Sequence, residues 1–184
     1  MTELKLLANQ IGANERTLRR AFNEGTLRAE RPTPRKLVLG SDEKQYLRRS
    51  WKLLAALREA LRTEQNVRFA LLFGSAARGD DGEGSDVDLI VELRDSSLVR
   101  VVDLGLKLEG ALERRVDALT VEEAEASPLL FAEALREGRV IVDREGRWAE
   151  MQPKAEQVAR RARRHERARG RRALAGVDRL LARS

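Results

Sequence analysis

The sequence predicts a mixed α/β fold, with one central α/β domain and smaller segments before and after it. Two apolar runs of strand length, Val67 to Phe73 and Val87 to Leu93, lie close together in the middle of the chain. Segments with apolar residues at helical spacing flank them, the longest from about Glu43 to Arg62. With 184 residues, the chain can form one domain with an appendage or two small domains.

The composition excludes several kinds of protein. Because there is no cysteine, disulfides and thiolate metal sites are excluded. The N-terminus, MTELKLLANQ, lacks the pattern of a signal peptide, and no apolar run approaches the length of a membrane span. We therefore expect a soluble cytoplasmic protein that does not interact with membranes.

The charge is distributed unevenly around a net value of +6. Residues 1–66 carry 14 Lys and Arg against 8 Asp and Glu, residues 67–146 carry 10 against 18, and residues 147–184 carry 12 against 4. An acidic middle between basic ends fits a metal-binding centre flanked by segments that contact phosphate, although solvated helix surface explains such charges equally well.

The first 23 residues have the pattern of a helix-turn-helix. A first helix from about Glu3 to Ile11 would end at Gly12 in left-handed conformation, and Asn14 is a good N-cap for a second helix from Glu15 to Asn23. Its outer face would present the polar residues Arg16, Thr17, Arg19 and Arg20 to DNA. The alternative is a small helical bundle that packs on the central domain or on a partner.

Two short strands, Leu27 to Arg31 and Lys36 to Leu39, would follow as a basic hairpin around a turn that contains Arg35, a further candidate for DNA contact. Ser41 and Asp42 would then cap the long helix from Glu43 to Arg62, which we expect to link two domains. Its stripe of Leu47, Trp51, Leu54, Leu57 and Leu61 predicts core packing. The expected division is residues 1–42, 43–66, 67–146 and 147–184.

Asp86 and Asp88 are carboxylates at the start of the second apolar run. In a strand, residues two apart point to the same face, so these side chains would stand side by side. Close carboxylates repel each other unless a cation lies between them, and oxygen ligands suit Mg²⁺ or Mn²⁺. A lone Asp-x-Asp is otherwise ordinary polarity at a strand edge.

Beyond this pair, the sequence predicts a helix from Asp95 to Arg114 with a wide apolar face, a strand from Arg115 to Thr120, one helix from Glu122 to Glu137, and a closing strand at Val140 to Val142. Residues 147–184 are expected to be helical and basic. The first part carries a thin stripe of Ala155, Val158, Ala159 and Ala162. The last part carries Leu174, Val177, Leu180 and Leu181, which would form a homodimer contact or pack on the long linker helix.

The spacing of Gly74-Ser75, ten residues and Asp86-Val87-Asp88 resembles the signature of the minimal nucleotidyltransferases of the DNA polymerase β superfamily. The resemblance covers about residues 66–145 and implies a polymerase-β-like core with a mixed sheet and flanking helices. It implies that Asp117 joins Asp86 and Asp88 as a catalytic, metal-binding carboxylate. It further implies that Gly74 and Ser75 bind the phosphates of a nucleoside triphosphate. Arg78 would assist with phosphate charge, or would pair with Asp80 or Asp81.

The resemblance also implies a function. An enzyme of this family would transfer AMP from ATP to a protein, as the antitoxin partner of a HEPN ribonuclease toxin. The N-terminal segment resembles winged helix-turn-helix modules of the excisionase or MerR type and would bind the operator of its own operon. Two alternatives stay open: a nucleotidyltransferase acting on RNA or a small molecule, and a DNA-binding regulator whose core only senses nucleotide.

Overall fold

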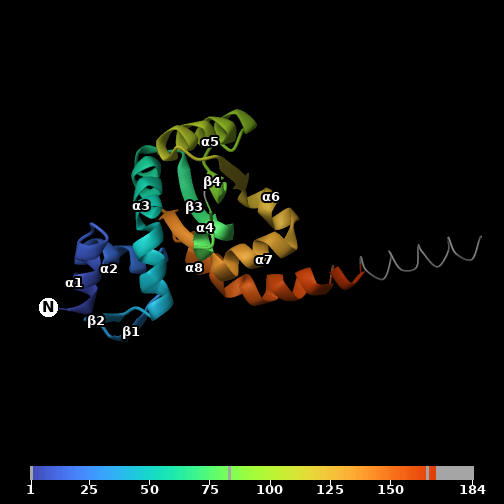
Figure 1. The fold of residues 1–184 in the computed structure, drawn as a ribbon. Coiled ribbons are helices and arrows are strands. Elements are labelled where there is room, and N and C mark those ends of the chain that lie inside the picture. Colours follow the sequence, from blue (N-terminus) through green and yellow to red (C-terminus); the bar gives the residue numbers. More distant parts are fainter. Residues whose placement is uncertain (1, 83, 165, 169–184) are drawn as a thin grey trace, which may run out of the picture.

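The computed structural model describes residues 2–82, 84–164 and 166–168. Its N-terminal part contains two short helices, a two-stranded hairpin and one long helix that leads to the central sheet (Figure 1). These elements are α1 (Glu3–Gln10), α2 (Glu15–Asn23), β1 (Glu30–Thr33), β2 (Lys36–Val38) and α3 (Ser41–Thr63).

The central sheet has four strands in the order β5-β4-β3-β6. The strands are β3 (Val67–Phe73), β4 (Val87–Leu93), β5 (Val116–Thr120) and β6 (Arg139–Asp143). Strand β3 is antiparallel to β4 and β6, whereas β4 and β5 are parallel, so the sheet is mixed as the sequence predicts. The other helices are α4 (Gly74–Arg78), α5 (Leu98–Leu112), α6 (Val121–Ala126), α7 (Pro128–Glu137), α8 (Arg147–Met151) and the short 3-10 helix η1 (Gln152–Lys154).

The first two helices begin and end for the expected local reasons. The Asn14 side chain accepts a hydrogen bond from the Thr17 backbone N–H at 2.7 Å and so caps α2. Gly12 has φ +70°, the left-handed conformation that glycine adopts at low cost after a helix. Leu18, on the inner face of α2, is fully buried.

Several element boundaries differ from the sequence prediction. The segment expected to form one helix from Glu122 to Glu137 breaks at Ser127, because Pro128 has no N–H to continue a helix and instead begins α7. Strand β1 extends through Pro32, which was expected in the turn, and this short hairpin is exposed enough to tolerate a residue without a donor. Helix α3 begins at Ser41 with Gly40 as its N-cap, so Ser41 and Asp42 do not cap it.

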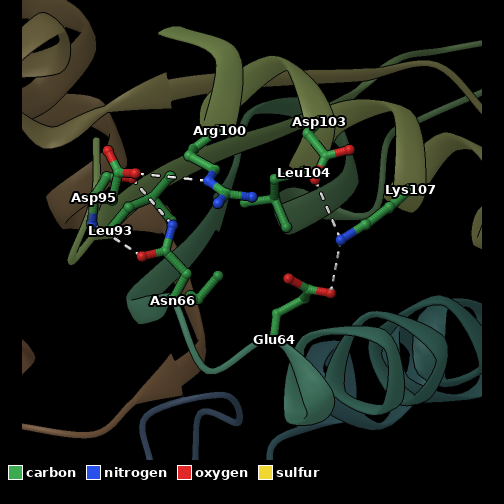
Figure 2. A pocket seen from close by; sticks show the side chains of 9 residues that line it. Glu64, Asn66, Leu93, Asp95, Arg100, Asp103, Leu104 and Lys107 are labelled. Atoms are coloured by element: carbon green, nitrogen blue, oxygen red, sulfur yellow. Dashed lines mark hydrogen bonds and ion pairs between the residues drawn. The ribbon is translucent and has the colours of Figure 1, made fainter. Parts of the chain in front are cut away.

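Helix α5 packs against β5 and α3, and polar side chains connect it to the segment between α3 and β3 (Figure 2). The Asn66 side chain donates to the Asp95 carbonyl at 3.0 Å and accepts from the Asp95 N–H at 2.9 Å, just before α5 begins. Lys107 forms ion pairs with Glu64 at 3.3 Å and with Asp103 at 3.2 Å. The expected wide apolar face is buried only in part, at Leu104 and Leu108.

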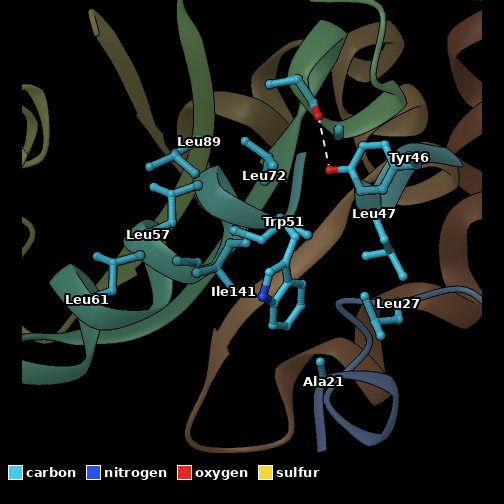
Figure 3. Packing of buried hydrophobic residues seen from close by; sticks show 14 of the residues in the cluster. Ala21, Leu27, Tyr46, Leu47, Trp51, Leu57, Leu61, Leu72, Leu89 and Ile141 are labelled. Atoms are coloured by element: carbon cyan, nitrogen blue, oxygen red, sulfur yellow. Dashed lines mark hydrogen bonds between the residues drawn. The ribbon is translucent and has the colours of Figure 1, made fainter. Parts of the chain in front are cut away.

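The buried hydrophobic side chains of the described residues form two clusters, and α3 contributes to the larger one. Its stripe of Leu47, Trp51, Leu54, Leu57 and Leu61 is buried, as predicted. Figure 3 shows this stripe packing against strand residues such as Leu72, Leu89 and Ile141. The N-terminal part also contacts the sheet directly, since the Thr26 hydroxyl donates to the Val140 carbonyl at 2.6 Å.

The chain after α8 continues along the central domain. Residues 155–164 are helical, and Ala162 is buried. Ala155 and Val158 are partly buried against a second, smaller cluster of buried side chains that includes Phe69, Phe131 and Met151. The leucine stripe proposed as a dimer contact lies outside the described residues. Among the helices that the structure describes, none is long and apolar enough to cross a membrane.

Candidate active site

The register of the sheet brings two of the expected carboxylates together. Strands β4 and β5 run parallel with Asp88 directly opposite Asp117. Asp88 is half-buried, and Asp117 is exposed because β5 is the edge strand. Asp86 lies one residue before β4, half-buried, with its carboxylate 3.7 Å from the Arg115 guanidinium.

Gly74 occupies a position that only glycine can fill without strain. Strand β3 ends at Phe73, opposite Asp88, and the chain turns directly into α4 with φ +68° at Gly74. A β-carbon at Gly74 would lie far inside van der Waals contact of the Asp88 carboxylate. The backbone of Gly74 and Ser75 can therefore approach a ligand next to Asp88, which a larger residue would prevent.

One open cavity contains most of these groups. Asp88, Asp117, Gly74, Ser75 and Arg78 all line it. Its other wall is largely apolar and includes residues that the sequence analysis did not select as functional, namely Phe73, Leu119, Ser127, Leu129, Leu130 and Glu133. The only sequence signal for this wall was the apolar run after Pro128, which is typical of core packing, yet half of Leu129 is exposed.

Arg78 lies at the edge of this cavity and is held by acidic side chains. Its guanidinium contacts Asp80 at 3.1 Å and Glu133 at 2.8 Å, and these partners raise its pKa, with the Asp80 hydrogen bond as the largest cause. Of the two pairings considered from the sequence, the one with Asp80 is present. Asp81 instead pairs with Arg114 at 2.9 Å.

The electrostatics of the cavity favour a bound cation. Burial raises the pKa of Asp88, and the negative charges of Asp117 and Asp86 raise it further, while Arg78 opposes this shift. A divalent cation beside Asp88 would relieve both the desolvation and the repulsion.

The metal that the resemblance implies fits this donor set. Among the described residues, no three carboxylate or imidazole groups converge closely enough to form a complete protein cage for a metal. Mg²⁺ is usually held by one or two carboxylates, with waters and substrate phosphates completing an octahedron, so an open pair such as Asp88 and Asp117 suits it. Asp86 is the third carboxylate close enough to influence Asp88.

Comparison with known proteins agrees with this geometry. The family model described as "Polymerase beta, Nucleotidyltransferase" matches residues 55–147. The chain belongs to the polymerase-β nucleotidyltransferase family. It is an enzyme that transfers a nucleotide, and residues 55–147 include every carboxylate and phosphate-binding candidate described above.

Two relatives of this nucleotidyltransferase are both named as protein adenylyltransferases. A putative protein adenylyltransferase of Methanocaldococcus jannaschii is 39% identical over 75 residues, which cover 40% of this chain and 78% of that protein. The protein adenylyltransferase MntA of Thermococcus cleftensis is 39% identical over 66 residues, which cover 35% of this chain and 67% of that protein.

Solved structures share the fold of this nucleotidyltransferase at low sequence identity. A crystal structure described as a toxin–antitoxin with AMP-PNP has a TM-score of 0.55 and 20% identity, covering 66% of this chain and 98% of that one. A mutant of the toxin–antitoxin MntA-HpeT has a TM-score of 0.52 and 19% identity, covering 68% and 98%.

Behind α4, a buried network joins the nucleotidyltransferase site to the N-terminal part. Arg139 is 2% exposed, and its guanidinium forms two hydrogen bonds with the Glu43 carboxylate, at 2.7 and 2.9 Å. The same side chain donates to the carbonyl oxygens of Ala77, at the end of α4, and of Thr26, at 2.7 and 3.2 Å. This network holds the last turn of the helix that begins with Gly74 and Ser75.

Tyr46 supports the same helix from α3. Its hydroxyl donates to the Ala76 carbonyl oxygen at 3.1 Å (Figure 3), and the Arg139 guanidinium stacks 3.5 Å from its ring centre. Burial raises the pKa of Tyr46 to about 12, so the phenol stays protonated and keeps this hydrogen bond. Sequence reasoning missed Glu43, Tyr46 and Arg139, because their connection depends on contacts between distant segments.

The residues proposed for DNA contact lie in two places. Arg16, Thr17 and Arg20 line a groove between α2, α3 and β6, while Arg35 is exposed in the turn between β1 and β2. Arg19 is tied to Glu15 at 2.6 Å. Thr17 bonds the capping Asn14 through both its N–H and its hydroxyl.

Proposed function

We propose that this nucleotidyltransferase transfers AMP from ATP to a hydroxyl group of a partner protein. The observation that carries this proposal is the placement of Asp88 opposite Asp117 beside the Gly74-Ser75 turn, within one cavity. Support for adenylyl transfer to protein comes from the two relatives at 39% identity, both named as protein adenylyltransferases.

Each group has a proposed part in the reaction. Backbone N–H groups at Gly74 and Ser75 bind the triphosphate, with Arg78 at the rim adding positive charge. The acceptor oxygen attacks the α-phosphorus and forms a new P–O bond, while the bond between the α-phosphorus and the bridging oxygen breaks and pyrophosphate leaves. Exposed at the sheet edge, Asp117 accepts the proton that the hydroxyl loses.

Asp86, Asp88 and Asp117 would hold Mg²⁺ or Mn²⁺, which stabilise the charge on the attacking and leaving oxygens when they are bound. Asp88 is the central member of this set in our proposal, because its carboxylate is half-buried and the charges of both Asp86 and Asp117 raise its pKa.

The acceptor is, in this proposal, a toxin of the HEPN class, and this chain is its antitoxin. The resemblance of the signature implies this partner, and the structures that share the fold include toxin–antitoxin proteins. Two functions compete with this proposal: transfer of the nucleotide to RNA or to a small molecule, and a DNA-binding regulator whose core only senses nucleotide.

The test uses ATP labelled at the α- or at the γ-phosphate, Mg²⁺, and the protein encoded beside this chain. We expect the α-label, and not the γ-label, to appear on that protein. Asp88→Asn and Asp117→Asn should abolish labelling, whereas Asp42→Asn, a change at an exposed carboxylate on α3, should not. Label on RNA alone, or unchanged labelling by Asp88→Asn, would contradict the proposal.

We also propose that residues 1–42 bind duplex DNA, with α2 and the β1–β2 hairpin as the contacting elements. Arg16, Arg20 and Arg35 are exposed and carry the proposed phosphate contacts. Arg19 and Thr17 complete the proposed surface. In this division, residues 43–66 connect the module to the catalytic domain at 67–146, and residues 147–184 form a basic extension.

A further inference from the structure

Helix α5 exposes a stripe of large apolar side chains. Leu98, Val102 and Leu106 follow one another at four-residue spacing and are 77%, 50% and 63% exposed. Exposed apolar side chains that are contiguous, rather than scattered, usually mark an interaction surface. The opposite flank of the helix is already occupied by the ion pairs of Lys107 and by Leu104 in the core (Figure 2).

The stripe forms one wall of a groove, here called the α5–β5 groove, whose other wall is strand β5. Gly105 lies in this groove in the middle of α5, and a β-carbon there would meet no atom of the described residues within 4 Å. Glycine inside a helix is less stable than alanine, and the packing of the described residues gives no reason for it. Close approach of another chain would give one.

The groove is continuous with the active site. Asp117 and Leu119 line both the α5–β5 groove and the cavity that contains Gly74 and Asp88. A ligand in the groove therefore ends beside the carboxylate that is proposed to accept the proton of the acceptor. The edge of β5 is also open, since β5 pairs only with β4 in the part of the chain that the structure describes.

The chemistry of the lining selects the kind of ligand. Its charged members are all acidic, namely Asp117, Glu122 and Glu123, and its walls are otherwise mostly aliphatic. A polyanionic nucleic acid would be repelled there, and a small polar acceptor would leave the apolar stripe in water. A protein segment with apolar side chains and flanking Lys or Arg fits both features.

We propose that the α5–β5 groove binds the acceptor protein, through an apolar segment that places its hydroxyl group at Asp117. This inference rests on the proposed transfer to a protein and adds where that protein docks. The groove thus selects the acceptor, while the Gly74-Ser75 side of the same cavity binds the nucleotide.

The test compares neighbouring positions on α5. Leu98→Glu and Leu106→Glu put a charge into the groove, whereas Val99→Glu puts the same charge at a position that is 75% exposed but does not line the groove. All three side chains are exposed, so the fold should tolerate each change. The probe is the protein that wild type labels with α-labelled ATP, titrated over a range of concentrations.

We expect Leu98→Glu and Leu106→Glu to raise KM for the acceptor protein at least tenfold, with KM for ATP within about twofold of wild type. Val99→Glu should match wild type. Gly105→Leu should give a sharper result, because filling the groove should block the acceptor while better helix propensity keeps or raises the melting temperature. If this face had only a structural role, a variant that keeps or gains stability would not lose transfer.

Three outcomes would overturn the inference. If wild type labels the protein and the groove variants label it equally well, the acceptor docks elsewhere. If wild type labels no protein, the proposed function fails and this inference fails with it. If light scattering shows that wild type is a dimer and Leu106→Glu a monomer with unchanged KM, the groove binds a second copy of this chain instead.

Discussion

Replacing Arg139 with methionine should uncouple α4, the helix that begins with Gly74 and Ser75, from the N-terminal part. Methionine keeps much of the length and apolar volume of the arginine stem but removes every donor. The change deletes both hydrogen bonds to Glu43 and the bonds to the Ala77 and Thr26 carbonyls. It also removes the guanidinium from the ring of Tyr46.

The expected size of the effect follows from burial. Glu43 is only 8% exposed, and without Arg139 its carboxylate would keep the Arg28 backbone N–H at 3.1 Å as its hydrogen-bond partner. Removing one partner of a buried ion pair typically costs about 3–5 kcal/mol, because an uncompensated charge stays in the interior. The double variant Arg139→Met with Glu43→Gln should be more stable than Arg139→Met alone, because that charge is then gone.

Urea unfolding followed by circular dichroism measures these free energies. A matched control is Arg58→Met, since Arg58 bonds Glu24 and Thr26 across the same boundary but has no contact with α4 among its hydrogen bonds. Arg139→Met should raise KM for ATP more than it lowers kcat, and Arg58→Met should not. A loss below about 1 kcal/mol for Arg139→Met, or strictly additive losses in the double variant, would refute this reasoning.

Three further predictions concern other parts of the protein. Gly74→Ala should abolish transfer and destabilise the fold, because its β-carbon would overlap the Asp88 carboxylate. Gly146 also has positive φ, but no described residue lies close to where its β-carbon would be, so Gly146→Ala should cost only the backbone strain of about 1–3 kcal/mol. Transfer assays and urea unfolding midpoints measure both effects. Tyr46 is the only tyrosine, so phenolate absorbance reports it alone. Because its pKa is raised to about 12, the unfolded chain loses this proton first, and stability should fall by about 2 kcal/mol as pH rises from 10 to 12; ionisation near pH 10 in folded protein would contradict its burial. Arg16→Ala and Arg20→Ala should each weaken duplex DNA binding and reduce the salt dependence by about one unit, as measured by mobility shifts at several salt concentrations; an unchanged shift would move the DNA surface elsewhere.

The sequence predicts best what depends on neighbouring residues. Strands β3 and β4 have the bounds expected from their apolar runs, and α2 begins after Asn14 because its cap is a local hydrogen bond. The proximity of Asp117 to Asp88 came from the resemblance, and the parallel register of β4 and β5 agrees with it. These features depend only on short segments and on the spacing between Gly74-Ser75 and the Asp86-Val87-Asp88 segment.

Features that depend on distant segments could not be predicted in this way. The partners Glu43 and Arg139 are 96 positions apart, and nothing in either local pattern indicates that they meet. The sequence predicts the closing strand only at Val140 to Val142, whereas β6 begins at Arg139. Only the packing of α3 against β6 and α4 makes a buried arginine favourable at that position.

Helix α5 shows how a wrong expectation of burial can indicate function. Apolar spacing alone cannot separate a face that packs on the core of its own chain from a face that packs on another chain, since both need the same side chains. The structure separates them: Leu104 and Leu108 are buried, whereas Leu98, Val102 and Leu106, which also follow one another at four-residue spacing, are exposed. Of these two sets, only the exposed one borders the groove that leads to Asp117, which is the exposure that our proposal of acceptor binding requires and that incomplete packing does not explain.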